Sequence, residues 1–128
     1  TGAMLNSSLV ALGGAIGAAT RYGVSLAFGA RSEAWPWATF SINVLGSFLI
    51  GVLAGWLSTR ADAGEPWRLF LGVGILGGFT TFSAYSLETL RLIERQDYTG
   101  AAAYSAGSVL AGLAAVAIGI AIARRVLA

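Results

Sequence analysis

The residues best suited to handling an ion lie in segment 76–83, which reads Leu-Gly-Gly-Phe-Thr-Thr-Phe-Ser. Two adjacent glycines followed by two threonines are weak helix formers, and they stand inside a long apolar stretch. Non-helical backbone inside a bilayer is tolerated only where protein buries it or where it lines a polar path. The segment therefore predicts a break in a membrane helix, and a site there that binds or conducts an ion.

The carbonyl groups of this break, including those of Gly77 and Thr80, are candidate cation ligands. Unwound carbonyls at mid-membrane hold monovalent cations such as Na+ in other membrane proteins. If two chains pair antiparallel about a twofold axis, their breaks could meet and carbonyls from both could converge on one ion. The chain contains neither Cys nor His, so the usual ligands of transition metals are absent.

Two aromatic residues follow the break, Phe82 and Tyr85, and a spacing of three places them on one helical turn. Aromatic rings carry a positive edge. A small anion stripped of water could pass along ring edges, hydroxyls and amide N–H groups, because conduction needs sites that are occupied but easily vacated. The alternative is that these rings pack against protein or lipid.

Polar residues form a stripe in the second apolar stretch, where Thr39, Asn43 and Ser47 recur at four-residue spacing and share one helix face. The Asn43 amide either joins two helices or donates to an anion from an aqueous vestibule. A second stripe, Tyr104 and Ser108, lies in the last apolar stretch. Serine hydroxyls in membrane helices often bond to their own carbonyls, so the case for a polar path rests on both stripes flanking one break.

Charged and hydroxylated residues near the break have open roles. Glu88 stands about 12 Å along the helix axis from the break, as a vestibule residue or as the partner of an arginine. Arg21 either snorkels to the membrane interface or attracts anions to a vestibule. Thr81 and Ser83 belong to the break itself as vestibule or structural residues.

The elements that position these groups follow from composition. The chain has 128 residues, 56% of them hydrophobic and 11% charged, whereas soluble domains carry roughly 25% charged residues. A spanning helix needs about 20 apolar residues, so the chain has room for four spans and no appended soluble domain. We predict an all-α membrane protein with spans at residues 9–28, 37–57, 67–92 and 98–123, the third broken at mid-membrane.

Tryptophans support the middle boundaries, because indole rings favour the headgroup level. Trp35 and Trp37 open the second span, Trp56 closes it and Trp67 opens the third. A helix between Trp37 and Trp56 rises about 28 Å, close to a hydrocarbon core of about 30 Å. The second span is therefore of membrane length.

Orientation signals are nearly balanced across the predicted membrane. Four spans place both termini on one side, and Lys/Arg asymmetry between short loops sets orientation. The two sides carry nearly equal numbers of arginines, and so small a difference favours insertion in both directions and antiparallel pairing. Short loops, however, also give close counts by chance. The terminal side holds Arg60, Arg68, Arg124 and Arg125; the other side holds Arg31, Arg91 and Arg95, with Arg21 inside the first span near its end.

Several functions are disfavoured by the same composition. The net charge is only +2 and the basic residues are scattered, which does not indicate nucleic-acid binding. No nucleophile–base pair is visible, so an enzyme is not expected. Met4 is the only methionine, and we interpret residues 1–3 as an expression scar ahead of a single channel domain at residues 4–128, without a secretory signal.

Three motifs together resemble the Fluc fluoride-channel family, also called CrcB. They read GGAIGAATRY at residues 13–22, ATFSINVLGSF at residues 38–48, and GGFTTFSAYSLE at residues 77–88. The third is highly specific, and the other two occur in the right order and at the right spacing. The resemblance covers essentially the whole chain after Met4.

The resemblance implies a dual-topology antiparallel homodimer with two fluoride pores, exporting toxic fluoride passively across a prokaryotic cell (inner) membrane. It also implies a structural central Na+ and no organic cofactor. Two positions depart from the pattern: Tyr85 stands where Phe is frequent, and Gly112 where relatives can carry a hydroxyl. The residues carried over are Gly77 and Thr80 as Na+ ligands through their carbonyls, and Asn43, Phe82, Tyr85, Tyr104 and Ser108 along the fluoride pathway.

Two rivals fit part of these features. A small dual-topology, proton-coupled multidrug exporter shares the length, the span count and the weak orientation bias. It needs a titratable group within the membrane, and Glu88 is the only candidate and is not central. A structural membrane subunit would leave the break and both polar stripes without a purpose.

Overall fold

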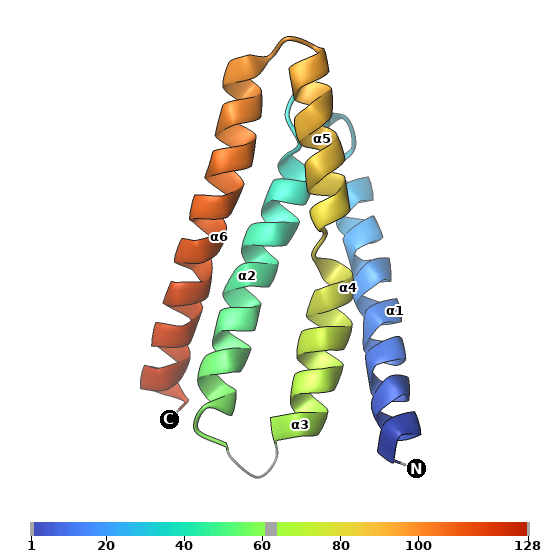
Figure 1. Ribbon diagram of the computed structural model, residues 1–128, viewed down its shortest axis with the longest axis vertical. Coiled ribbons are helices and arrows are strands. Elements are labelled where there is room, and N and C mark those ends of the chain that lie inside the picture. Colours follow the sequence, from blue (N-terminus) through green and yellow to red (C-terminus); the bar gives the residue numbers. More distant parts are fainter. Residues whose placement is uncertain (1, 61–63, 128) are drawn as a thin grey trace.

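The computed structural model of the chain describes residues 2–60 and 64–127. Within them are four helical segments long and apolar enough to cross a bilayer, which confirms the predicted four-helix membrane architecture (Figure 1). Of the three residues interpreted as an expression scar, Thr1 lies outside the described residues, and Gly2 and Ala3 begin the first helix. The four segments are Gly2–Ser32, Trp37–Leu57, Gly64–Glu94 and Tyr98–Val126.

The ends of the helices follow local sequence signals. Helix α1 (Gly2–Phe28) continues into a short 3-10 helix, η1 (Gly29–Ser32), and α2 (Trp37–Leu57) has the predicted bounds. Helix α6 (Tyr98–Val126) starts where Asp97 accepts a hydrogen bond from the Gly100 amide at 2.9 Å, as helix N-caps do. Sequence reasoning therefore located these ends well, although α1 begins and α6 ends further out than predicted.

The third membrane-spanning segment consists of four consecutive helical elements. It consists of α3 (Gly64–Trp67), a π-helix η2 (Arg68–Leu76), α4 (Gly77–Phe79) and α5 (Phe82–Glu94). The interruption falls at Thr80 and Thr81, both in extended conformation, with φ and ψ of −83° and 157° and of −149° and 123°. The break thus lies inside the predicted segment, but the two glycines before it are still helical, and its depth in a bilayer stays a prediction.

The helices pair through close backbone contacts. Helix α2 packs mainly against α6, and α1 packs against η2 and α4. A Cβ at Gly51 of α2 would collide with the Val116 backbone of α6, and one at Gly78 of α4 would lie 3.0 Å from the Gly14 Cα of α1. These glycines therefore allow close helix approach, as small residues do at the interfaces of membrane helices.

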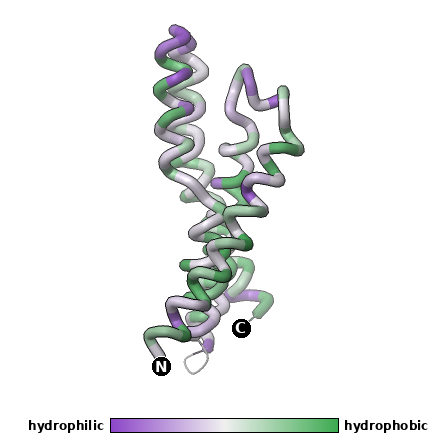
Figure 2. Tube along the Cα trace, turned by 90° about the vertical axis from the view of Figure 1, so that its right-hand side faces the viewer, coloured by the Kyte–Doolittle hydropathy of each residue, from purple (hydrophilic) through white to green (hydrophobic). Residues whose placement is uncertain are grey.

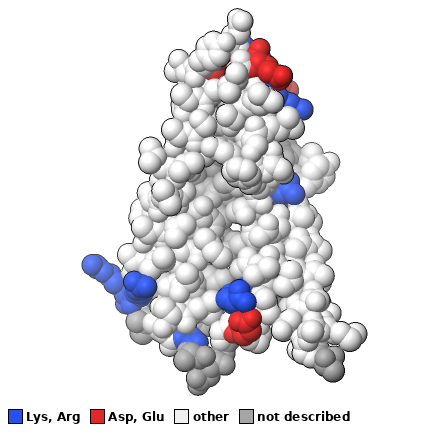
Figure 3. All heavy atoms as spheres, viewed as in Figure 1, with Lys and Arg blue, Asp and Glu red and all other residues white. Residues whose placement is uncertain are grey.

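Polarity is arranged along the long axis of the molecule. Hydrophilic residues gather toward the two ends of the trace, and most charged side chains on the visible face also lie toward the ends (Figures 2 and 3). Both termini lie at one end, as an even number of spans requires (Figure 1). At the other end, Leu92, Ala101 and Tyr104 form a buried cluster with Trp35 and Phe40 packed against it.

Candidate functional site

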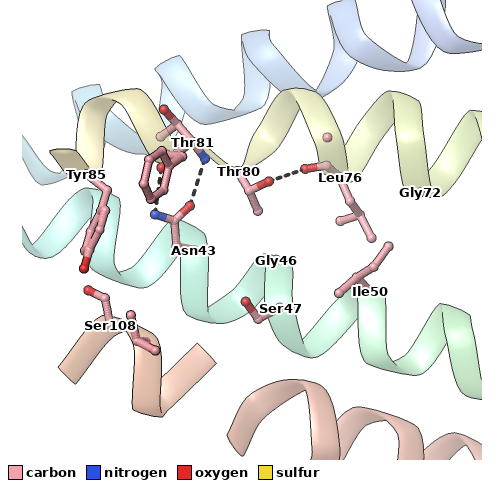
Figure 4. Close-up of a pocket in the computed structure, with 13 residues that line it drawn as sticks. Asn43, Gly46, Ser47, Ile50, Gly72, Leu76, Thr80, Thr81, Tyr85 and Ser108 are labelled. Carbon is pink, nitrogen blue, oxygen red and sulfur yellow. Dashed lines mark hydrogen bonds between the residues drawn. The ribbon is translucent and has the colours of Figure 1, made fainter. Parts of the chain in front are cut away.

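A cavity of about 450 Å³ lies beside the interruption, between α2, the broken third segment and α6 (Figure 4). None of the described residues that line it is charged, and glycines and aliphatic side chains form the rest of its wall. Its hydrogen-bonding and aromatic side chains are Asn43, Ser47, Thr80, Thr81, Phe82, Tyr85 and Ser108.

Asn43 bonds to the interrupted backbone through both atoms of its amide. Its Nδ2 donates to the Thr81 carbonyl at 3.0 Å, and its Oδ1 accepts from the Thr81 amide at 2.9 Å (Figure 4). The extended Thr81 has a free donor and a free acceptor, and the asparagine satisfies both as a neighbouring strand would. Asn43 therefore joins α2 to the break, and one Nδ2 hydrogen remains beyond this pair.

The interruption of the helix also takes the usual backbone N–H donors away from two carbonyl groups. In an uninterrupted α-helix the Gly77 carbonyl would accept from the Thr81 amide, which here donates to Asn43. The Thr80 carbonyl would accept from the Ala84 amide, which here donates to Thr81 Oγ1 at 3.2 Å. Both carbonyls named from the sequence as Na+ ligands have thus lost their helical donors, and their binding of Na+ stays a prediction.

The Thr80 side chain is held on both sides. Its hydroxyl donates to the Leu76 carbonyl at 2.8 Å, and a Cβ at Gly46 of α2 would collide with its Cγ2 methyl. Gly46 therefore makes room for the break. Sequence reasoning missed this role, because Gly46 and Thr80 are distant in the chain and the glycine resembles the many others used for packing.

The aromatic residues form a row at one end of the cavity. The ring centroids of Phe82 and Tyr85 are 5.7 Å apart, with planes inclined by 39°, and those of Tyr85 and Tyr104 are 5.3 Å apart. Phe82 is 78% exposed in the single chain, whereas Tyr104 is fully buried. Phe82 and Tyr85 thus line the cavity, and Tyr104 supports Tyr85 from behind.

Hydroxyl groups of α2 and α6 meet across the cavity from the break. Ser108 Oγ is buried and has no hydrogen-bond partner among the described residues. A Cβ at Gly112 would lie 3.4 Å from Ser47 Oγ, so Ser47 faces the position where the α6 stripe lacks a hydroxyl. Ser108 therefore keeps a hydroxyl hydrogen that no described residue accepts.

Glu88 lies away from this cavity, within a network of hydroxyls. Its Oε2 accepts from Thr39 Oγ1 at 3.1 Å and its Oε1 from the Tyr104 hydroxyl at 3.0 Å. Of the two roles open for Glu88, arginine pairing is not found among the ion pairs of the described residues. Glu88 instead lines a second cavity of about 410 Å³, together with Arg91 and Arg95.

Arg21 and Ser83 contact the interruption from outside the cavity. Arg21 Nε on α1 donates to the Gly78 carbonyl at 3.3 Å, near the C-terminal end of α4, where a positive charge is favourable. Ser83 Oγ and Thr81 Oγ1 are 3.3 Å apart. Neither of the two roles considered for Arg21 included this contact with the break.

The structure therefore separates the residues selected from the sequence into two groups. One group gathers at the cavity: Asn43, Ser47, Gly77, Thr80, Thr81, Phe82, Tyr85 and Ser108. The others, Arg21, Thr39, Ser83, Glu88 and Tyr104, bond to or support members of the first group or to one another.

Four long apolar helices, with an uncharged cavity at a helix interruption, define a small multi-pass membrane protein. Residues 8–120 match the family described as CrcB-like protein, Camphor Resistance (CrcB). The chain belongs to this family.

Similar proteins carry the name Fluoride-specific ion channel FluC. The one from Phenylobacterium zucineum is 55% identical over 122 residues, covering 94% of this chain and 96% of the relative. The one from Novosphingobium aromaticivorans is 51% identical over 126 residues, covering 96% and 99%. The one from Caulobacter vibrioides is 50% identical over 122 residues, covering 94% and 96%. These relatives give no support to the multidrug-exporter alternative.

Proposed function

We propose that the chain is a fluoride-selective ion channel that lets fluoride leave a bacterial cell passively and so relieves its toxicity. The observation that carries the proposal is the uncharged cavity beside the break, lined by hydrogen-bond donors and aromatic rings. The relatives named as fluoride-specific channels support the choice of ion. The cell (inner) membrane is the compartment in which such a channel acts.

The chemistry of the cavity suits a small anion that must not be held tightly. The free hydrogen of Asn43 Nδ2 and the hydroxyl of Ser108 replace water as donors, and the positive ring edges of Phe82 and Tyr85 add weaker attraction. A fixed cation in the same place would bind the ion too strongly for release. The network of Glu88, Thr39 and Tyr104 connects this region to the second cavity and belongs to the vestibule.

The residues at the break also fit a structural Na+. The carbonyl oxygens of Gly77 and Thr80, whose helical donors are engaged elsewhere, are hard neutral ligands of the kind that Na+ binds. In a pair of chains, a bound Na+ would supply a central positive charge that fixes the break of one chain relative to the break of the other. Arg21 and Asn43 hold the backbone that presents these oxygens.

The partner in this proposal is a second copy in antiparallel orientation. The highly exposed ring of Phe82 and the open side of the cavity leave the site incomplete in one chain. A twofold axis through the break would give two equivalent pores and one shared Na+. Because one chain supplies both orientations, a homodimer suffices.

The test of the proposed function is ion efflux from liposomes that contain the purified protein. We expect rapid fluoride loss and negligible chloride loss, measured with ion-selective electrodes. Proton-coupled uptake of a cationic dye without fluoride efflux would overturn the proposal. Empty liposomes and liposomes with an unrelated four-helix membrane protein are the controls.

Removal of sodium tests the proposed cation site. When the protein is purified and reconstituted with a large organic cation in place of Na+, we expect slower fluoride efflux and a lower dimer fraction on size-exclusion chromatography. Both should recover when Na+ is returned. An unchanged efflux and dimer fraction in thoroughly sodium-free conditions would contradict a structural Na+.

A further inference from the structure

The hydroxyl group of Tyr85 has a partner that sets it apart from a bare aromatic ring. It donates to the carbonyl of Ser105 on α6 at 2.8 Å. A phenol has one hydrogen, so this bond leaves none for an ion in the cavity. Tyr85 therefore meets the cavity with its ring and not with its O–H.

Ser108 stands one helical turn beyond the carbonyl that Tyr85 occupies. Serine and threonine in membrane helices usually donate to the carbonyl three or four residues earlier, and the neighbouring hydroxyls do so. Ser86 donates to Phe82 at 3.0 Å, Thr89 to Tyr85 at 2.8 Å, and Ser105 to Ala102 at 3.4 Å. Ser108 Oγ is an exception, because it is buried and has no partner among the described residues.

The two observations are connected through the Ser105 carbonyl. This oxygen has two lone pairs: the helix uses one for the Val109 amide, as in any α-helix, and Tyr85 uses the other. The carbonyl three residues before Ser108 is thereby filled, which removes one of the two back-bonded rotamers of Ser108. Both Tyr85 and Ser108 line the cavity, with the Tyr85 hydroxyl directed toward α6 (Figure 4).

We infer that Tyr85 is a positioning residue for Ser108. By filling the Ser105 carbonyl, its hydroxyl takes that back-bond away from Ser108 and leaves the buried Ser108 O–H unpaired beside the cavity, where an entering anion can use it as a donor. The inference rests on the proposed function, since it names how this chain arranges one donor of the fluoride path. It also gives the tyrosine hydroxyl a role of its own.

The test is a double-mutant cycle with Tyr85→Phe and Ser108→Ala, read out as fluoride efflux from liposomes. Tyr85→Phe removes only the oxygen, and we expect efflux to fall about tenfold, the scale of one weakened hydrogen bond to a charged ligand. Fluoride efflux through the Ser108→Ala variant should fall by a similar or larger factor. If Tyr85 acts through Ser108, the double variant matches Ser108→Ala, because the two effects are then not independent.

Tyr98→Phe is the matched control, because Tyr98 is an exposed tyrosine of α6 away from the cavity and loses the same atom. Its efflux should equal that of the unmodified protein. Size-exclusion chromatography confirms that each variant keeps its oligomeric state. Wild-type efflux in Tyr85→Phe, or multiplicative losses in the double variant, would overturn the inference and leave the channel function intact. Absence of fluoride efflux from the unmodified protein would instead overturn the proposed function itself.

Discussion

At the scale of single residues, Asn43 lies where both of the roles left open by the sequence are possible. Its amide pairs with both backbone groups of Thr81 and so joins two helices. It also lines the cavity with one donor hydrogen to spare. The same side chain can therefore hold the break in shape and contact an anion.

Replacing Asn43 by aspartate should disrupt both roles. In Asn43→Asp the side chain keeps an acceptor for the Thr81 amide but faces the Thr81 carbonyl without a hydrogen. Two like charges 4 Å apart near a protein surface repel by about 4 kcal/mol, so we expect fluoride efflux to fall at least about a hundredfold. Asn6→Asp, at an exposed position of α1, makes the same change away from the cavity and should leave efflux unchanged. Normal efflux in Asn43→Asp would remove this residue from the pathway.

The Phe82 ring gives a second prediction at this scale. Phe82→Ile retains an apolar side chain but loses the positive ring edge, so efflux should drop by about tenfold or more. The dimer should persist, as judged by size-exclusion chromatography. Phe82→Tyr keeps the ring edge and should retain most of the flux. Equal efflux in all three proteins would show that the ring lies outside the conducting path.

At the scale of elements, the interruption is built by neighbours more than by its own glycines. Gly77 and Gly78 remain helical, whereas Thr80 and Thr81 are extended. The Asn43 amide and the Arg21 guanidinium supply partners to backbone groups at and beside the break. Gly78 instead allows α1 to lie close to α4, because a Cβ there would lie 3.0 Å from the Gly14 Cα.

Close packing of α1 can be tested with two alanine substitutions in one helix. A Cβ at Gly17 would collide with the Ile75 carbonyl and lie 2.8 Å from the Phe79 amide nitrogen. We expect Gly17→Ala to destabilise the protein by roughly 1–3 kcal/mol, as overpacking does, measured by thermal unfolding in detergent. Gly23→Ala is the matched control, because nothing lies within 4 Å of its added methyl. Equal loss of stability in both variants would place the effect outside this contact.

Sequence reasoning located the helices because their signals are local. Apolar length and tryptophan positions predicted 37–57, which α2 matches. The bonds from Tyr85 to Ser105 and from Arg21 to Gly78 were not predictable, because they join residues 20 and 57 positions apart and depend on how helices cross. The π-helix was also missed, since the same residues suit an α-helix and only packing selects between the two.

At the scale of the whole molecule, arginine residues are distributed almost evenly between the two ends. The terminal end carries Arg60, Arg68, Arg124 and Arg125, and the opposite end carries Arg31, Arg91 and Arg95. So small a difference gives the insertion machinery little direction. The proposed antiparallel pair follows if both orientations are inserted into one membrane.

Insertion in both directions predicts a divided labelling pattern. When a C-terminal tag is probed from one side of sealed vesicles, about half of the molecules should react, because opposite orientations expose the tag on opposite faces. Permeabilised vesicles give the total for comparison. Adding two lysines near the C-terminus should shift the ratio and reduce efflux, since fewer antiparallel pairs can form. Labelling of all molecules from one side would contradict the pairing.

The π-helix Arg68–Leu76 sets a limit on how this protein can evolve. A π-turn accommodates one more residue than an α-turn between the same two hydrogen-bonded groups. Deleting one residue there would close the turn to an ordinary α-turn between the same two groups, whereas deleting one from a regular α-helix would rotate everything after it by about 100°. Substitution is limited there instead, because a Cβ at Gly74 would lie 3.0 Å from the Gly13 Cα of α1.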